Sequence, residues 1–278
     1  MVALSIYTDE EKSEIANLFA KMFIARPDIK AIQRSNGDYN PVQSRFTKAD
    51  LLDHQDGVYT YGHYLLSEKN ECKLFVFDLD LDKTDPKHPE ITYDLPSSKD
   101  EADIWQDWYH GDPRNIWLDR SRITERDFLK YQLRVAANQI CKAIQDELGI
   151  PMAVTYTGAK GVHVYGFTGS MAASAVREAA DIVIESLGLV PEKGNNFFKF
   201  PKSGRSDFQP QSITAEVYPK QTTLDGKTHG NLVRLPLGVN LKNPKDPTFF
   251  MDMRANYGEQ CFTPRNAIDA LTTKNIWA

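Results

Sequence analysis

The chain has 278 residues, of which 41% are hydrophobic and 26% charged, enough for one large domain or two small ones around a sizeable core. This composition excludes a disordered chain, a collagen-like chain and a coiled coil. The formal net charge of −5, from 33 Lys and Arg against 38 Asp and Glu, argues against a protein that coats nucleic acid through overall basicity.

Capping residues, apolar periodicity and helix-breaking residues predict five helices. Their expected starts lie near Thr8, Thr47, Thr124, Met171 and Thr263. The first two begin with a capping box, in which Glu11 and Asp50 follow the threonine by three residues. Gly149 is expected to end the third helix, and Gly188 to follow the fourth at about residue 187.

Segments rich in β-branched and aromatic residues lie between these helices and predict strands. The expected strands cover residues 58–66, 72–81, 152–157, 161–167, 213–218 and 231–238. Helices and strands alternate irregularly, and short glycine-containing turns separate two pairs of strands. This pattern favours a mixed or antiparallel sheet with helices on it, so the sequence predicts an α+β fold.

Charge is distributed unevenly along the chain. Residues 78–112 carry 11 Asp and Glu against 3 Lys, whereas residues 193–242 carry 8 Lys and Arg against 3 Asp and Glu. Part of the acidic segment contains several prolines and is expected to be a long surface insertion. The chain is therefore electrically divided, although its net charge is small.

The cysteines and the apolar runs indicate the cellular setting. Cys72, Cys141 and Cys261 lie far apart and include no C-x-x-C pair, so neither a zinc site nor a disulfide framework is expected. No signal peptide is visible, and no apolar run approaches the ~18 residues that span a bilayer. We expect a cytoplasmic protein without zinc and without membrane contact.

An acidic row is expected where the strand 72–81 ends. Asp78 and Asp80, with Asp82 beyond them, alternate with apolar residues in the segment FDLDLD and therefore point to one face. Two carboxylates on one face repel each other unless they are protonated or bridged by a cation, and oxygen ligands suit Mg²⁺ or Mn²⁺. The alternative is a solvated strand end that enters an acidic loop.

The segment TGAKGVH between two predicted strands is a candidate phosphate site. Gly158 and Gly161 allow a tight turn whose N–H groups face an anion, and Thr157, Lys160 and His163 add a hydroxyl, a point charge and an imidazole. The alternative is a plain hairpin turn with an exposed lysine and a packed histidine.

A third carboxylate, Glu216, lies in the predicted strand 213–218. If it faces the two aspartates, it completes a three-carboxylate site for two divalent cations, the arrangement used for in-line phosphoryl transfer. Lys220, Gln221 and Arg234 could then neutralise a triphosphate. The alternative is an outward-facing glutamate and a surface arginine.

Together these motifs resemble the archaeo-eukaryotic primase superfamily, whose members are primases and primase-polymerases. FDLDLD is similar to the first acidic motif, TGAKGVH to the Ser/Thr-Gly-x-Lys-Gly-x-His motif, and Glu216 stands at the third acidic position. The segments EVYPKQ and GNLVRLPLG look like the version found in phage, plasmid and defence-associated primase-polymerases.

The resemblance implies roles for particular residues. Asp78, Asp80 and Glu216 would bind two divalent metals, Mg²⁺ or Mn²⁺, and catalyse transfer of a nucleotide from an NTP or dNTP to a 3′-hydroxyl with release of pyrophosphate. The residues that would hold the nucleotide are Thr157, Gly158, Lys160, Gly161, His163, Lys220, Gln221 and Arg234. Glutamate replaces the aspartate that many members carry at the third acidic position, and the zinc ligands of many full primases are missing.

The resemblance also implies an architecture. One catalytic domain, residues 1–278, would consist of two αβ modules with the active site between them, one of them like an RNA-recognition motif. An N-terminal module and insertion (1–70 and 83–150) would accompany a catalytic core (71–82 and 151–242) and a C-terminal extension (243–278). The implied partners are single-stranded or primed DNA, nucleoside triphosphates, and a helicase or other domains of a longer protein.

Template contact requires a basic surface beside that cleft. The segment NNFFKFPKSGRSDF combines Lys199, Lys202 and Arg205 with three phenylalanines, a mixture that suits single strands. A phenylalanine cluster anchored in the core, with solvated cations around it, is the alternative.

Two other functions are compatible with the sequence. A D-x-D glycosyltransferase would explain Asp78 and Asp80 but gives no role to Lys160 or His163. The other is a module that binds single-stranded nucleic acid and has kept the fold of the family but lost its catalytic activity.

Overall fold

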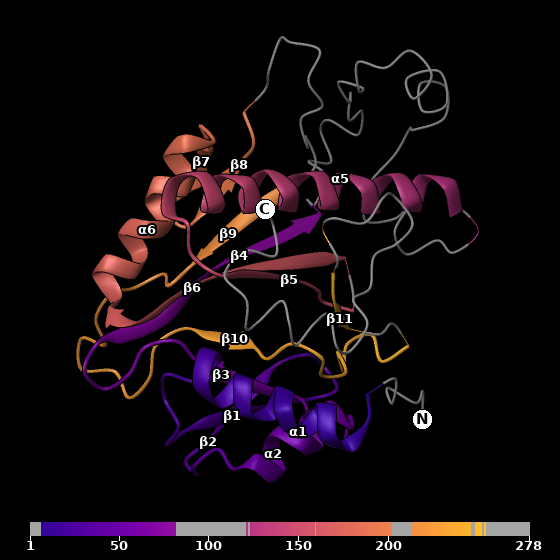
Figure 1. Cartoon of the computed structure of the whole chain (residues 1–278), viewed down its shortest axis with the longest axis vertical. Coiled ribbons are helices and arrows are strands. Elements are labelled where there is room, and N and C mark those ends of the chain that lie inside the picture. Colours follow the sequence, from indigo (N-terminus) through magenta and orange to yellow (C-terminus); the bar gives the residue numbers. More distant parts are fainter. Residues whose placement is uncertain are drawn as a thin grey trace.

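The computed structural model describes residues 7–81, 121, 123–158, 160–201, 213–245, 248–251 and 253. The described elements form two antiparallel sheets with helices packed against them (Figure 1). The α+β arrangement that the sequence predicts is therefore present in this part of the chain. None of the helices in these ranges is long and apolar enough to cross a membrane.

The first sheet has four strands in the order β10-β3-β1-β2. The strands are β1 (Lys30–Gln33), β2 (Tyr39–Val42), β3 (Tyr61–Tyr64) and β10 (Leu232–Arg234). The N-terminal helical elements are α1 (Asp9–Leu18), the π-helical turn η1 (Phe19–Phe23) and α2 (Lys48–Gln55). Both predicted capping boxes are confirmed, at Thr8 with Glu11 and at Thr47 with Asp50.

The second sheet has seven strands in the order β11-β5-β6-β4-β9-β8-β7. The strands are β4 (Glu71–Leu81), β5 (Met152–Tyr156), β6 (Gly161–Ala172), β7 (Val190–Lys193), β8 (Phe197–Lys199), β9 (Ile213–Tyr218) and β11 (Phe249–Phe250). Helices α5 (Ile123–Ala143), continued by the π-helical turn η2 (Ile144–Leu148), and α6 (Ala173–Ser186) pack on this sheet (Figure 1).

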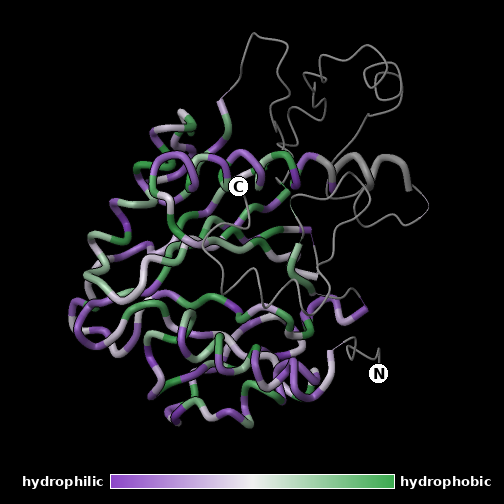
Figure 2. Tube along the Cα trace, viewed as in Figure 1, coloured by the Kyte–Doolittle hydropathy of each residue, from purple (hydrophilic) through white to green (hydrophobic). Residues whose placement is uncertain are grey.

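Hydrophobic residues concentrate in the central strands, whereas polar residues follow the outer turns (Figure 2). Along β4 the buried side chains Phe77 and Leu79 alternate with Asp78 and Asp80, which are partly exposed and exposed. Because neighbouring residues of a strand point to opposite faces, the helices cover the apolar face while the carboxylates lie on the other.

Several predicted boundaries need correction. The fourth helix begins at Ala173 and not near Met171, because strand β6 continues to Ala172 and pairs there with the start of β4. The predicted strand 231–238 ends at Arg234, since the carbonyls that follow contact His54 instead of a strand. The helix expected near Thr263 lies outside the described residues.

The sequence interpretation missed five short strands, and composition explains part of the failure. Strand β2 contains Pro41, which lacks an N–H group and is tolerated because β2 is an edge strand.

Cys72 and Cys141 are buried free thiols, while Cys261 lies outside the described part of the chain.

Two fully buried histidines link the fold to pH. His54 on α2 accepts the backbone N–H of Tyr61 at its Nδ1, 2.9 Å away, and its Nε2 lies 2.9 Å from the carbonyl oxygen of Pro236. The pKa of His54 is lowered to about 4 and that of His63 to about 3, and burial is the main cause of both shifts. Both side chains are therefore neutral in the folded protein at pH 7.

We expect folding stability to fall as the pH drops below about 6.5, the pKa of an unperturbed histidine. Only the unfolded chain takes up protons at His54 and His63 between pH 6.5 and 4, so each should cost about 2 kcal/mol at pH 5. Urea unfolding at pH 7 and pH 5 should show a smaller pH dependence for His63→Leu than for the wild type. Equal dependence in both proteins would contradict a neutral, buried His63.

Candidate active site

The strand register places the sequence-predicted residues side by side. Asp78 on β4 lies opposite His163 on β6 and opposite Glu216 on β9. Residues opposite each other in an antiparallel ladder point to the same face, so the three side chains form one row across the centre of the sheet. Phe197 on β8 lies opposite Glu216 and continues this row.

A second row runs beside the first, two residues along each strand. Asp80 lies opposite Gly161 on β6 and Thr214 on β9, and Thr214 lies opposite Lys199 on β8. Asp78 and Asp80 therefore share the face on which the alternation in FDLDLD predicts them. Their side chains are 27% and 53% exposed, so solvent and ligands can reach both carboxylates.

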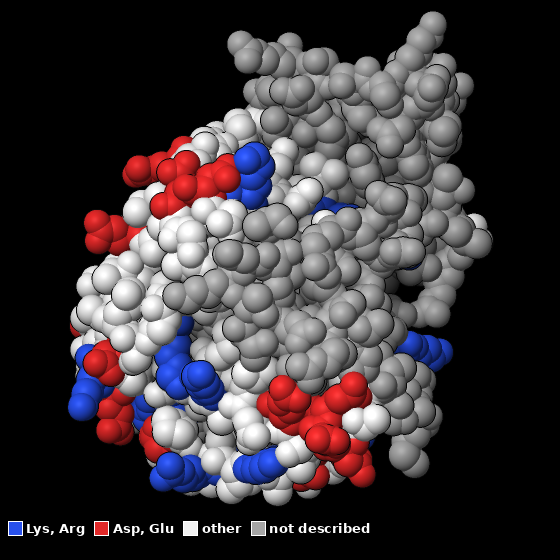
Figure 3. Space-filling view, viewed as in Figure 1, with Lys and Arg blue, Asp and Glu red and all other residues white. Residues whose placement is uncertain are grey.

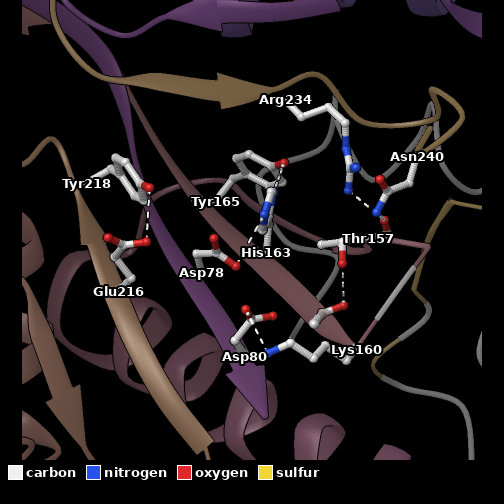
Figure 4. Close-up of polar contacts among 11 residues, drawn as sticks. Asp78, Asp80, Thr157, Lys160, His163, Tyr165, Glu216, Tyr218, Arg234 and Asn240 are labelled. Atoms are coloured by element: carbon white, nitrogen blue, oxygen red, sulfur yellow. Dashed lines mark hydrogen bonds and ion pairs between the residues drawn. The ribbon is translucent and has the colours of Figure 1, made fainter. Parts of the chain in front are cut away.

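Each of the three carboxylates contacts a cationic or ionisable side chain, and Figure 4 shows these contacts for Asp78 and Asp80. Oδ1 of Asp78 lies 3.3 Å from Nε2 of His163, and Oδ2 of Asp80 lies 3.1 Å from Nζ of Lys160. Glu216 forms an ion pair with Lys220. In this arrangement the chain itself offsets the repulsion within the acidic row.

Two tyrosines complete this network, and each stands two residues after a site residue on the same strand. The hydroxyl of Tyr218 donates a hydrogen bond to Oε2 of Glu216 over 3.0 Å, and Tyr165 lies 2.8 Å from Nδ1 of His163 (Figure 4). The sequence interpretation did not name either tyrosine as a site residue. The period-two spacing from Glu216 and His163 was the signal that could have identified them.

The two aspartates have different proton affinities. Burial raises the pKa of both, but at Asp78 the contact with His163, together with the charges of Arg234 and Lys160, outweighs burial and holds the pKa below its ordinary value. At Asp80 the charge of Asp78 adds to burial, and Lys160 does not compensate, so the pKa is raised. The charge of Asp78 is therefore one cause of the raised pKa of Asp80, and a bound cation would lower this remaining repulsion.

The donor chemistry fits a hard divalent cation, because Asp78, Asp80 and Glu216 offer only oxygen ligands on one face of the sheet. Among the described residues, however, no group of three or more His, Cys, Asp or Glu side chains is arranged to hold a metal ion. Asp80 and Glu216 instead form ion pairs with Lys160 and Lys220.

The turn after β5 lies directly against Asp80. The backbone N–H and the hydroxyl of Thr157 both donate to the carbonyl oxygen of Gly161, over 3.1 and 3.0 Å. A Cβ atom at Gly161 would come within 2.8 Å of the Leu79 carbonyl oxygen and would collide with the Asp80 carboxylate. Glycine at position 161 is therefore required for the carboxylate to lie where it does.

The first sheet contributes an arginine to this turn. Arg234 at the end of β10 donates from Nη2 to the Thr157 carbonyl oxygen over 2.5 Å, and Nδ2 of Asn240 lies 3.3 Å from the same oxygen (Figure 4). Asn240 is buried and follows the last strand of the first sheet. No pattern in the sequence identified this asparagine, because its role depends on the packing of two sheets.

Two pockets meet at Asp78, Asp80 and Lys160, which line both of them. The arginine pocket, about 280 Å³, is also lined by Tyr39, Thr157, His163, Arg234, Asn240 and Lys242. The phenylalanine pocket, about 490 Å³, is also lined by Leu81, Glu192, Lys193, Phe197, Thr214 and Glu216. The acidic row therefore lies at the junction of two spaces with different chemistry.

Gln221 and Lys199, two other predicted residues, do not line either of these pockets. Gln221 donates its amide to the Thr223 carbonyl oxygen over 3.0 Å and lines a separate pocket of about 520 Å³ beside Arg177. Lys199 forms an ion pair with Glu192 over 2.9 Å. Lys202 and Arg205, the other predicted nucleic-acid contacts, lie outside the described residues.

Acidic and basic side chains are unevenly distributed on the molecular surface. Among the described residues on the face shown in Figure 3, acidic side chains gather around the start of α1, where Asp9, Glu10 and Glu11 follow one another, and again at the upper left, while Lys and Arg form only small groups. The described part of this face therefore carries no continuous basic surface, in keeping with the net charge of −5.

Comparison with known families shows which family the chain resembles. The family model for the archaeo-eukaryotic primase domain of TOTE conflict systems matches residues 13–277. That range includes both sheets and every site residue described above. No curated protein matches the chain.

Proposed function

The chain belongs to the archaeo-eukaryotic primase domains of TOTE conflict systems, and from this membership we propose that it is a DNA-directed primase-polymerase. The 3′-hydroxyl oxygen of a primer or an initiating nucleotide attacks the α-phosphorus of an NTP or dNTP. A new P–O bond forms, the bond from the α-phosphorus to the bridging oxygen breaks, and pyrophosphate leaves. The hydroxyl proton passes to solvent.

One observation carries the proposal: two pockets open on the same pair of aspartates, and one of them is cationic. In addition to the three shared residues, the arginine pocket contains His163, Arg234 and Lys242 and no further carboxylate. A triphosphate fits this charge, and its α-phosphate would then lie beside Asp78 and Asp80.

We assign the metal-binding role to Asp78, Asp80 and Glu216, whose oxygen donors suit Mg²⁺ or Mn²⁺. Two such cations, held by these residues, would lower the pKa of the attacking hydroxyl and stabilise the charge on the leaving oxygen. Cation binding would compete with the ion pairs that Lys160 and Lys220 form with Asp80 and Glu216.

The chain's own cations then hold the nucleotide. Arg234 presents a planar fork of donors, and Lys160 exchanges Asp80 for a phosphate oxygen when the substrate binds. His163 remains between Asp78 and the buried Tyr165, which together orient its ring towards the pocket. Thr157 and Gly158 contribute the turn that supports these side chains.

The sheet order supports a fold like the RNA-recognition motif for the catalytic core. Strands β5, β6, β4 and β9 lie in that order, and helices α5 and α6 pack on the sheet they form. We propose one catalytic domain over residues 1–278 in which the N-terminal part, through β3 and β10, brings Arg234 to this core.

A template–primer assay tests the proposed function. The full chain is incubated with single-stranded DNA, with or without a preformed primer, with NTPs or dNTPs, and with Mg²⁺, Mn²⁺ or EDTA. We expect template-dependent extension with one pyrophosphate released for each nucleotide added, and none in EDTA.

The assay also distinguishes the alternatives. DNA binding without extension under every metal condition would favour a nucleic-acid-binding module without catalysis. Turnover of a nucleotide sugar, in the absence of any extension, would favour a D-x-D glycosyltransferase.

A further inference from the structure

Phe197 occupies a defined position in the acidic row. It lies on β8 opposite Glu216, and its partly exposed ring lines the phenylalanine pocket. Nζ of Lys220, the partner of Glu216, lies 5.4 Å from the centroid of this ring. An aromatic ring is therefore held beside a candidate catalytic carboxylate, on the opposite side of that carboxylate from Asp78.

The two pockets differ in charge, and this difference indicates which part of the substrates each pocket binds. In addition to the residues that both pockets share, the phenylalanine pocket contains Glu192 and Glu216 against the single cation Lys193. Glu192 is itself engaged by Lys199 and by the hydroxyl of Thr214. This pocket therefore disfavours a triphosphate and suits a ligand group with little negative charge, such as a ribose with its base.

The position of this pocket restricts the ligand further. A group bound there touches Asp78 and Asp80 from one side while the triphosphate reaches them from the arginine pocket. The proposed reaction needs the 3′ end of the growing strand beside these carboxylates, because that end carries the attacking hydroxyl. A template base has no need to contact these carboxylates.

We infer that the phenylalanine pocket receives the 3′-terminal nucleotide of the growing strand and that its base stacks on Phe197. The inference rests on the proposed function, because it assigns the second substrate to the same site. Base stacking on an aromatic side chain tolerates every base, as a polymerase requires. Phe197 would thus set the affinity for the primer end without selecting a sequence.

The first test compares Phe197→Leu and Phe197→Trp with the wild type in steady-state extension. The leucine variant should raise KM for the primed template about tenfold, within the range for one lost base stack, and leave KM for the dNTP unchanged. The tryptophan variant should retain the wild-type KM. If Phe197→Leu instead raises KM for the dNTP alone, the pocket receives the incoming nucleotide and the inference is wrong.

A second test does not depend on catalysis. A primer that ends in 5-iododeoxyuridine is bound to the full chain on its template and irradiated, and the cross-linked residue is identified by mass spectrometry. We expect a cross-link at Phe197. If Phe197 cross-links only to an iodouracil placed in the template, the pocket assignment is wrong.

The two proposals can also fail separately. A primer cross-link at Phe197 without any extension would reject the proposed function and retain the pocket assignment. Extension without that cross-link would retain the proposed function and reject the pocket assignment.

Discussion

Asp78→Asn and Asp80→Asn are each expected to reduce nucleotide addition by at least about 10²-fold, the loss typical when one preorganised electrostatic group is removed from a transition state. Both changes keep the size of the side chain and remove the charge that would bind a cation beside the reacting phosphate. Asp78 and Asp80 are not closed off in the core, so the fold should persist. Single-turnover extension of a labelled primer measures the loss, and fluorescence anisotropy should show nearly unchanged DNA binding.

Asp146→Asn provides the matched control. Asp146 is a surface aspartate whose side chain is 52% exposed and pairs with Lys142 on the helical layer, so its loss should leave extension unchanged. If both site variants still extend primers in Mn²⁺, the metal-binding assignment is wrong, whatever the outcome of the binding measurement.

Local sequence patterns predicted the two strands that carry the three carboxylates. The strand 213–218 was predicted with its observed bounds, since Ile213, Ala215 and Val217 alternate with more polar residues. The same period-two pattern placed Asp78 and Asp80 on one face. These features depend on neighbouring residues alone, and the sequence contains that information directly.

The pairing of strands could not be predicted in this way. Asp78 lies between His163 and Glu216 only because β6 and β9 both pair with β4, and no local pattern specifies which strands become neighbours. Arg234 reaches the turn at Thr157 because β10 joins the other sheet. The ion pairs of the carboxylates also depend on this register, so the sequence suggested free ligands where the structure has paired ones.

The position of the fourth helix illustrates the same limit. Residues near Met171 have no strong strand signal, yet they extend β6 because Glu71 and Cys72 of β4 offer partners opposite them. Long-range pairing overrides a weak local preference, which moves the helix start to Ala173.

Arg234→Ala should lower kcat/KM for the incoming nucleotide about 10- to 100-fold, because a hydrogen bond to a charged group contributes roughly 1.5–3 kcal/mol and each 1.4 kcal/mol is a factor of ten. Arg234→Lys should restore only part of this loss, since a lysine keeps the charge but not the planar fork of donors. The apparent affinity for the primed template should stay the same, and inhibition by added pyrophosphate should weaken by a similar factor.

Asn240→Ala separates the charge of Arg234 from its structural contact. Both side chains contact the carbonyl oxygen of Thr157, but Asn240 carries no charge. If Arg234 acts on the triphosphate, Asn240→Ala should cost much less than Arg234→Ala and should leave inhibition by pyrophosphate unchanged. Equal losses in the two variants would show instead that Arg234 acts by holding the turn beside Asp80, and the phosphate-binding role would have to be assigned to Lys160 or Lys242.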